Sequence, residues 1–127
     1  MSHLFSHRSG PIVVAAEISG PKGKVDAFLL LDTGATTSTI NRKVLRVAGY
    51  DPAGITDFVE ITTGTGSARV PRLILNRLSA LGKHAIGIRV LAHDLPAGVA
   101  VDGLLGLDFF RDLLLSLDFR QGLIELT

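Results

Sequence analysis

Short apolar runs broken by clusters of turn residues dominate this chain of 127 residues. The first two runs, 12–18 and 25–31, are rich in β-branched residues and leucine, and the turn formers Ser19-Gly20-Pro21-Lys22-Gly23 separate them. Extended runs that flank such a cluster are typical of two antiparallel strands joined by a turn. The pattern therefore predicts a β-hairpin near the start of the chain.

A second hairpin is predicted between residues 58 and 75. The segments 58–62 and 68–75 are extended, and they flank the glycine-rich tip Thr63-Gly64-Thr65-Gly66-Ser67. Glycines allow the sharp turn and make such a tip mobile. Pro71 cannot donate a backbone hydrogen bond, so we expect the returning arm to be an edge strand or a bulged strand.

The remaining predicted elements are short. They are a helix that Asn41 caps and Gly49 ends, a strand at 85–91, a helix at 106–114, and a closing hairpin at 115–126 that turns at 120–122. Short strands with two short helices favour a small closed β-structure over alternating β and α units. We therefore predict an all-β fold, namely a small closed barrel.

The composition narrows the class of protein. A chain of this length with 46% hydrophobic residues can bury one modest core, which predicts a single domain over 1–127 with a flexible N-terminal segment at 1–10. The 13 basic and 12 acidic residues are scattered and the net charge is +1, so no nucleic-acid partner is expected.

The lack of cysteine and the lack of a long apolar run exclude further classes of protein. The sequence contains no cysteine, which rules out a disulfide framework and a thiolate nucleophile. It also has no apolar run of the roughly 18 residues that a membrane span needs, so we expect no membrane contact from this segment. A cytoplasmic location is expected if this is the whole chain. The location stays open if the segment was excised from a longer protein.

Candidate chemistry begins where the second apolar run ends, at Asp32-Thr33-Gly34. Hydrolysis of a peptide by carboxylates alone requires two of them close enough to share a proton, one as base and one as acid. This chain has one Asp-Thr-Gly, and its other candidate carboxylates stand in different contexts: Asp102, Asp108, Asp112 and Asp118. A two-fold homodimer would supply the second copy of Asp32 across its axis.

The neighbours of Asp32 have roles under this hypothesis. Gly34 lets the backbone turn sharply and approach a substrate, and the Thr33 hydroxyl can reach a backbone group across the two-fold axis. Ala35 cannot donate a hydrogen bond to the ionised carboxylate, so we expect activity at weakly acidic to neutral pH.

Three features in this order resemble the retropepsin-like, that is retroviral-type, aspartic proteases: Asp32-Thr33-Gly34-Ala35, the glycine-tipped hairpin, and Leu104-Leu105-Gly106. The resemblance covers about 12–126, and its C-terminal part is closer to cellular and bacterial single-domain members than to viral ones. It implies a dimeric aspartic endopeptidase that holds an extended peptide or protein substrate beneath two flaps.

The same resemblance implies site roles. Catalysis would rest on Asp32, Thr33 and Gly34, and Leu105 and Gly106 would be a structural motif. Substrate would contact Ala35, Thr63, Gly64, Thr65, Gly66 and Leu104. Further apolar pocket residues would be Leu30, Ile61 and Val101.

The chain also departs from the viral pattern. Thr36, Thr37 and Leu107 stand where viral enzymes usually carry acidic residues and an arginine. Contacts of the viral type at the dimer interface are therefore not carried over, and the strength of the dimer is left open.

Other interpretations explain less of the chain. A sugar-kinase or actin-like ATPase has a similar turn, but it needs two large lobes. A phosphoaspartate transferase would need a parallel βα architecture. A catalytically silent dimerisation or peptide-binding module remains the alternative, although such a binder has no need for a buried pair of like charges. His3 and His7 lack a third ligand nearby, and neither a metal nor a cofactor is expected.

Overall fold

The first hairpin consists of β2 (Val13–Gly20) and β3 (Gly23–Leu31), and buried and exposed side chains alternate along its strands. The computed structural model describes residues 2–127. Every residue of β2 pairs with one of β3, from Val13 opposite Leu30 to Gly20 opposite Gly23. This hairpin was predicted from the sequence, and the structure confirms it.

A nine-stranded sheet has the order β5-β6-β9-β4-β10-β3-β2-β7-β8. β10 (Gly103–Leu105) lies between β3 and β4 (Thr39–Ile40), parallel to β3 and antiparallel to β4. β4 is also parallel to β9 (Arg89–Ala92). These parallel pairings bring segments far apart in sequence into the centre of the sheet, where β3 ends.

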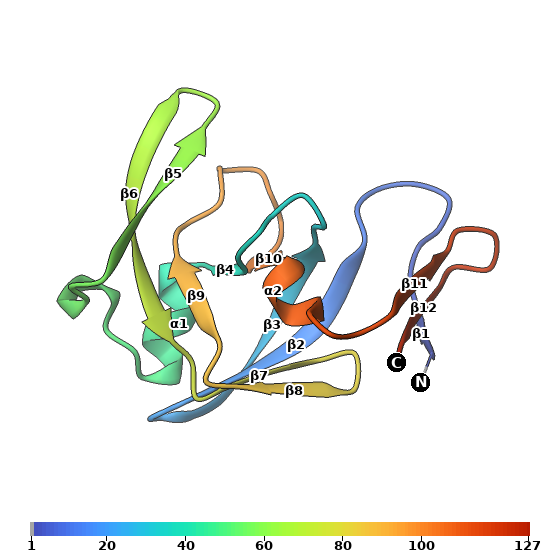
Figure 1. Ribbon diagram of the computed structural model, residues 1–127, viewed down its shortest axis with the longest axis horizontal. Coiled ribbons are helices and arrows are strands. Elements are labelled where there is room, and N and C mark those ends of the chain that lie inside the picture. Colours follow the sequence, from blue (N-terminus) through green and yellow to red (C-terminus); the bar gives the residue numbers. More distant parts are fainter. Residues whose placement is uncertain (1) are drawn as a thin grey trace.

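The two ends of the sheet are antiparallel hairpins. β5 (Phe58–Thr63) and β6 (Gly66–Ile74) form the hairpin that projects from the body in Figure 1. β7 (Arg77–Ala80) and β8 (Lys83–Ile86) form the other. The predicted glycine-tipped hairpin is therefore present.

A second sheet gathers the two ends of the chain (Figure 1). Its order is β1-β12-β11, with β1 (Ser2–Leu4), β11 (Leu115–Asp118) and β12 (Leu123–Leu126) all antiparallel to their neighbours. The predicted closing hairpin is thus confirmed. The N-terminal segment contains a paired strand, and its flexibility stays a prediction.

Short helices fill the connections: α1 (Arg42–Ala48), the 3-10 turn η1 (Pro52–Gly54) and α2 (Leu107–Phe110). Gly49 ends α1 in the left-handed conformation with φ of 101°, as predicted. Asn41 occupies the N-cap position, but its side chain makes no capping hydrogen bond. Instead, Asn41 Oδ1 accepts a hydrogen bond from Leu95 N, which ties the start of the helix to the loop after β9.

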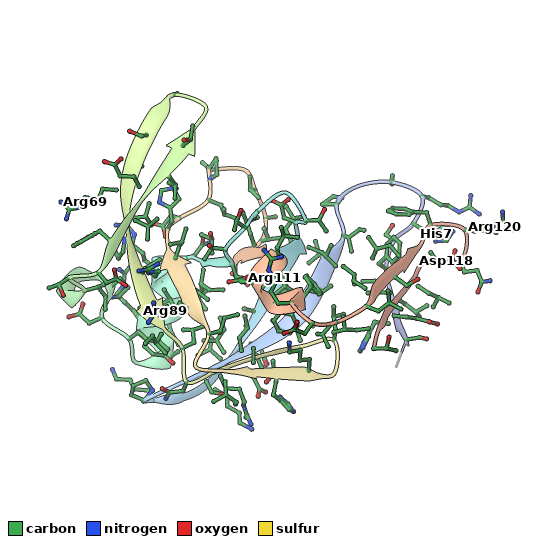
Figure 2. The ribbon with its side chains drawn as sticks, in the orientation of Figure 1. His7, Arg69, Arg89, Arg111, Asp118 and Arg120 are labelled. Carbon is green, nitrogen blue, oxygen red and sulfur yellow. The ribbon has the colours of Figure 1, made fainter. Side chains whose placement is uncertain are left out.

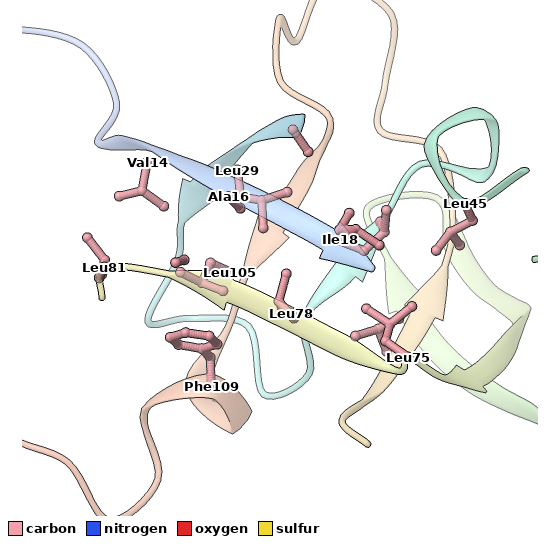
Figure 3. Close-up of a cluster of buried hydrophobic side chains, with 14 of the residues drawn as sticks. Val14, Ala16, Ile18, Leu29, Leu45, Leu75, Leu78, Leu81, Leu105 and Phe109 are labelled. Atoms are coloured by element: carbon pink, nitrogen blue, oxygen red, sulfur yellow. The ribbon is translucent and has the colours of Figure 1, made fainter. Parts of the chain in front are cut away.

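The core lies between the central strands and the helices. In Figure 3, side chains from β2, β3, β7, β10 and α2 meet in this core. Its largest fully buried members include Ile18, Leu29, Leu78, Leu105 and Phe109. Leu29 of β3 and Leu105 of β10 thereby anchor the two parallel strands whose ends carry the candidate site.

Three sequence expectations about individual elements are wrong. The segment 85–91 is not one strand, because Gly87, with φ of 66°, turns the chain between β8 and β9. The predicted helix at 106–114 is shorter, because Arg111 has extended backbone angles and Asp112 has φ of 64°. Of the two alternatives given for the arm with Pro71, the edge strand is wrong, because β6 lies between β5 and β9 in the sheet. Its pairing with β5 ends at Pro71, and its pairing with β9 begins at Arg72. The missing N–H therefore falls where the strand changes partner.

The fold class itself is confirmed. The structure is mostly β, and its sheet curls into half of a barrel. Within residues 2–127, no helix combines the length and the apolar character needed to cross a membrane.

Candidate active site

Asp32 follows β3 directly and begins a tight turn. Its Oδ1 accepts a hydrogen bond of 2.9 Å from Gly34 N, and its carbonyl oxygen accepts one of 3.2 Å from Ala35 N. The Asp32 side chain is half-buried, whereas Thr33 and Gly34 are exposed. The turn therefore presents the Asp-Thr-Gly backbone to the surface of the molecule while its own hydrogen bonds orient the carboxylate.

β10 runs beside β3, so the structural motif Leu105-Gly106 lies next to Asp32. Leu31 pairs with Leu105, and Asp32 N donates a hydrogen bond of 3.0 Å to Leu105 O. A Cβ added at Gly106 would lie 2.6 Å from Ala35 O. A glycine is needed there because the backbone of the Asp32 turn occupies the space of a side chain.

The start of α2 continues this contact. Leu107 N donates a hydrogen bond of 2.8 Å to Ala35 O, and Asp108 N donates one of 3.2 Å to Thr36 O. The loop 32–38 is therefore fastened along its length by the segment 105–108.

The sequence analysis missed two residues of this assembly, Ser38 and Asp108. The Asp108 carboxylate accepts hydrogen bonds from Ser38 N, at 3.0 Å to each oxygen, and from Ser38 Oγ at 2.6 Å. Ser38 is fully buried. From the sequence alone, Asp108 is a candidate only for a second catalytic carboxylate. The signal in the sequence was its place two residues after Gly106, in the segment that follows the structural motif.

A half-open hollow of about 450 Å³ lies beside this loop, between it and residues 59–62 of β5. Two expected substrate-binding residues, Ala35 and Leu104, line it, as does the expected pocket residue Ile61. Leu30 and Val101 are not among its described lining residues. The full lining is Ala35, Thr36, Thr37, Thr39, Val59, Glu60, Ile61, Thr62, Leu91 and Leu104.

The tip of the β5–β6 hairpin is exposed at Gly64, Thr65 and Gly66. Neither these three residues nor Asp32, Thr33 and Gly34 are among the described lining residues of the hollow, and their contacts with a substrate stay predictions. The side chain of Thr63 is outside the described part of the structure.

The two faces of the hairpin differ in polarity. The cross-strand pairs Val59–Val70 and Ile61–Ala68 place apolar side chains on one face. On the other face the Arg69 guanidinium lies 4.6 Å from the centre of the Phe58 ring. Figure 2 shows Arg69 pointing away from the body of the molecule, whereas Val59 and Ile61 of the apolar face line the hollow beside the Asp32 loop.

An ion pair braces the base of the hairpin. Arg72 Nε lies 2.9 Å from Asp57 Oδ2, and Arg72 N donates a backbone hydrogen bond of 2.8 Å to Asp57 O. The hydrogen bond from the Arg72 guanidinium lowers the pKa of the Asp57 carboxyl below its usual value. Both side chains are partly exposed, so this pair orients the hairpin more than it stabilises the fold.

The described residues do not suggest a metal centre. Within residues 2–127, no three histidine, aspartate or glutamate side chains are grouped to hold an ion. The chemistry available at the Asp32 turn is that of a carboxylate, backbone amides and hydroxyl groups.

A curled, mostly β fold whose central strand ends in an Asp-Thr-Gly turn, held by a neighbouring apolar-Gly segment, defines a retropepsin-like aspartic protease fold. The chain belongs to the aspartyl protease family, because the sequence profile of that family matches residues 14–109. The enzyme is an aspartic endopeptidase, as the sequence predicted.

Solved structures support the same fold. The chain is similar to a retropepsin-like aspartic protease from Rickettsia conorii, with a TM-score of 0.73 and 18% sequence identity. The match covers 99% of this chain and 88% of that one. No curated protein matches the chain in sequence.

Proposed function

We propose that the protein cleaves peptide bonds as a two-fold homodimer, with the Asp32 carboxylates of two copies forming the catalytic pair. The observation that carries this proposal is the Asp32 turn, in which one oriented carboxylate stands beside exposed Thr33 and Gly34 in a chain with a single Asp-Thr-Gly. An isologous interface at this turn supplies the second carboxylate without any further residue.

The pair would work by sharing one proton. Two ionised carboxylates about 3 Å apart repel by about 5 kcal/mol at an effective dielectric constant near 20, so the pair keeps one proton over a broad pH range. The ionised carboxylate takes a proton from water, and the protonated one donates to the carbonyl oxygen of the substrate. The two proton losses belong to the pair and not to one residue. Neither copy is therefore permanently the base or permanently the acid.

The substrate would be an extended peptide held between the Asp32 loop and the β5–β6 hairpin. The hollow beside the loop is lined by Val59, Ile61, Leu91 and Leu104, which suits an apolar side chain near the cleaved bond. The hairpin would act as a flap that closes over the peptide and excludes water. Backbone groups of both walls would pair with the peptide as with an added strand.

The test uses wild type and Asp32→Ala with a diverse peptide library between about pH 4 and pH 7, the range of a carboxylate pair. Mass spectrometry identifies the cleaved bonds. We expect cleavage next to apolar residues by wild type, a loss of cleavage in Asp32→Ala, and a weakly acidic to neutral optimum. Cleavage that persists in Asp32→Ala would refute the role of Asp32.

The pairing of the two copies needs its own measurement. Differently tagged wild-type and Asp32→Ala chains can be mixed, and the mixed dimer can be isolated by its two tags. We expect this mixed dimer to be inactive because it has one carboxylate. An active mixed dimer, or a strict monomer with full activity by sedimentation, would refute the shared site.

A further inference from the structure

We propose that Asp108 is a positioning residue: through Ser38, its carboxylate holds the loop that carries Asp32 in the geometry that the reaction requires. This inference rests on the proposed function, because it assigns a role at the same site. Neither residue touches the reacting atoms, so the effect would pass through the backbone of residues 32–38.

The hydrogen bonds around Ser38 form a chain. Gly106 N donates to Ser38 Oγ at 2.9 Å, and Ser38 Oγ donates to Asp108 Oδ1 at 2.6 Å. Ser38 N also donates to the Asp108 carboxylate, at 3.0 Å to each oxygen. A buried hydroxyl group that accepts from one residue of the segment 105–108 and donates to another holds its own loop at a fixed distance from that segment.

The carboxylate suits this position better than a neutral group. It accepts both the amide and the hydroxyl of Ser38, and hydrogen bonds to a charged acceptor are shorter and stronger than neutral ones. An apolar residue at 108 would leave the buried Ser38 donors without an acceptor, which the loop could relieve only by moving.

Movement at Ser38 would be transmitted to Asp32. The bonds from Asp32 N to Leu105 O, from Leu107 N to Ala35 O and from Asp108 N to Thr36 O tie the rest of the loop to the same segment that Ser38 binds, so a shift of this segment relative to Ser38 would also move the Asp32 turn. Thr33 and Gly34, between these ties, are exposed and have little packing of their own. In a catalytic pair, a misplacement of about 1 Å can cost about 100-fold in rate.

The chain offers a matched control at the other end of β10. The Asp102 carboxylate accepts a hydrogen bond of 2.8 Å from Phe28 N, and its carbonyl oxygen accepts one from Asn41 N. Among the described residues, these hydrogen bonds join β10 to β3 and to the start of α1, outside the loop 32–38. Asp102 directly precedes β10 and Asp108 follows it in α2, but only the Asp108 carboxylate binds the catalytic loop.

The experiment measures kcat and KM on a peptide that the wild-type dimer cleaves. We expect Asp108→Ala and Ser38→Ala to lower kcat by about 10- to 100-fold, with KM changed by less than about 3-fold because the apolar lining residues Val59, Ile61, Leu91 and Leu104 lie outside the loop. Asp108→Asn keeps one acceptor oxygen and should recover part of kcat. Asp102→Ala should lower the melting temperature without the loss of kcat.

Melting curves and sedimentation establish that each variant is a folded dimer at the assay temperature. If Asp108→Ala does not fold, Asp108→Asn and Ser38→Ala carry the comparison. The inference is overturned if kcat is unchanged in these variants, or if Asp102→Ala loses kcat to the same extent at an equal melting temperature. A wild-type protein without Asp32-dependent cleavage would overturn the proposed function as well, which distinguishes the two failures.

Discussion

Replacing Gly106 by alanine tests whether the close approach of β10 and the Asp32 loop is required. Gly106 has φ of −97° and ψ of −172°, which any residue can adopt, so the substitution introduces no backbone strain of its own. Its effect is purely steric. The added Cβ would lie 2.6 Å from Ala35 O, 3.0 Å from Thr37 C and 3.1 Å from Ser38 N.

The size of the effect follows from these distances. Ordinary contacts of a Cβ begin at 3.4 Å, so the carbonyl of Ala35 must retreat by about 0.8 Å, the difference between 3.4 and 2.6 Å. All three atoms belong to the main chain, and rotation of a side chain cannot relieve the contact. Overpacking of this kind typically costs about 1–3 kcal/mol of the free energy of unfolding. Since Ala35 is in the Asp32 turn, we also expect kcat to fall by up to about 100-fold.

Urea denaturation at neutral pH measures the change in the free energy of unfolding, with Gly64→Ala as the control. A Cβ at Gly64 meets no atom within 4 Å, so this control should change the free energy of unfolding by less than about 0.5 kcal/mol. In melting curves, each kcal/mol corresponds to roughly 3–6 °C for a chain of this length. If Gly106→Ala unfolds at the same urea concentration as wild type, the argument from close approach is wrong.

Two further predictions concern stability. Leu45→Ala in α1 should cost about 2–5 kcal/mol, because its side chain is fully buried in the core, whereas Val47→Ala on the exposed face of the same helix should be within about 0.5 kcal/mol of wild type in urea denaturation. Because Arg72 lowers the pKa of Asp57, the contribution of this pair is fully present above about pH 4 and is lost as the pH falls through the lowered pKa. The difference in melting temperature between wild type and Arg72→Ala should therefore be constant from pH 5 to pH 7 and shrink below about pH 4, and a difference that grows on acidification would contradict this account.

Features set by neighbouring residues could be predicted from the sequence. The turn between β2 and β3 and the end of α1 at Gly49 depend on local turn chemistry, which glycine and proline reveal directly. The family also followed from short motifs, because Asp32-Thr33-Gly34 and Leu105-Gly106 each mark a sharp change at the end of an apolar run. In the structure these two motifs are neighbours, although Asp32 and Leu104, which directly precedes the second motif, are 72 positions apart in the sequence.

Features set by pairing between distant segments could not be predicted. Ser38 and Asp108 are 70 residues apart, and each is unremarkable among its sequence neighbours. Pro71 correctly predicts a missing backbone hydrogen-bond donor. The change of strand partner from β5 to β9, however, depends on where β9 lies. Likewise, the apolar pattern at 85–91 is continuous, and only the tertiary structure requires the turn at Gly87.

The geometry of the two parallel strands also supports the need for a second chain. Asp32 and Gly106 follow the paired residues Leu31 and Leu105, so they stand at corresponding ends of β3 and β10. A second carboxylate placed at the end of β10 would require a side chain at position 106, where the Ala35 carbonyl leaves no room. The protomer has therefore filled the neighbouring strand end with backbone contacts that fasten Asp32 rather than with an acid that could pair with it. Under the proposed function, the other carboxylate of the catalytic pair would come from a second copy, in which Asp32 is fastened in the same way.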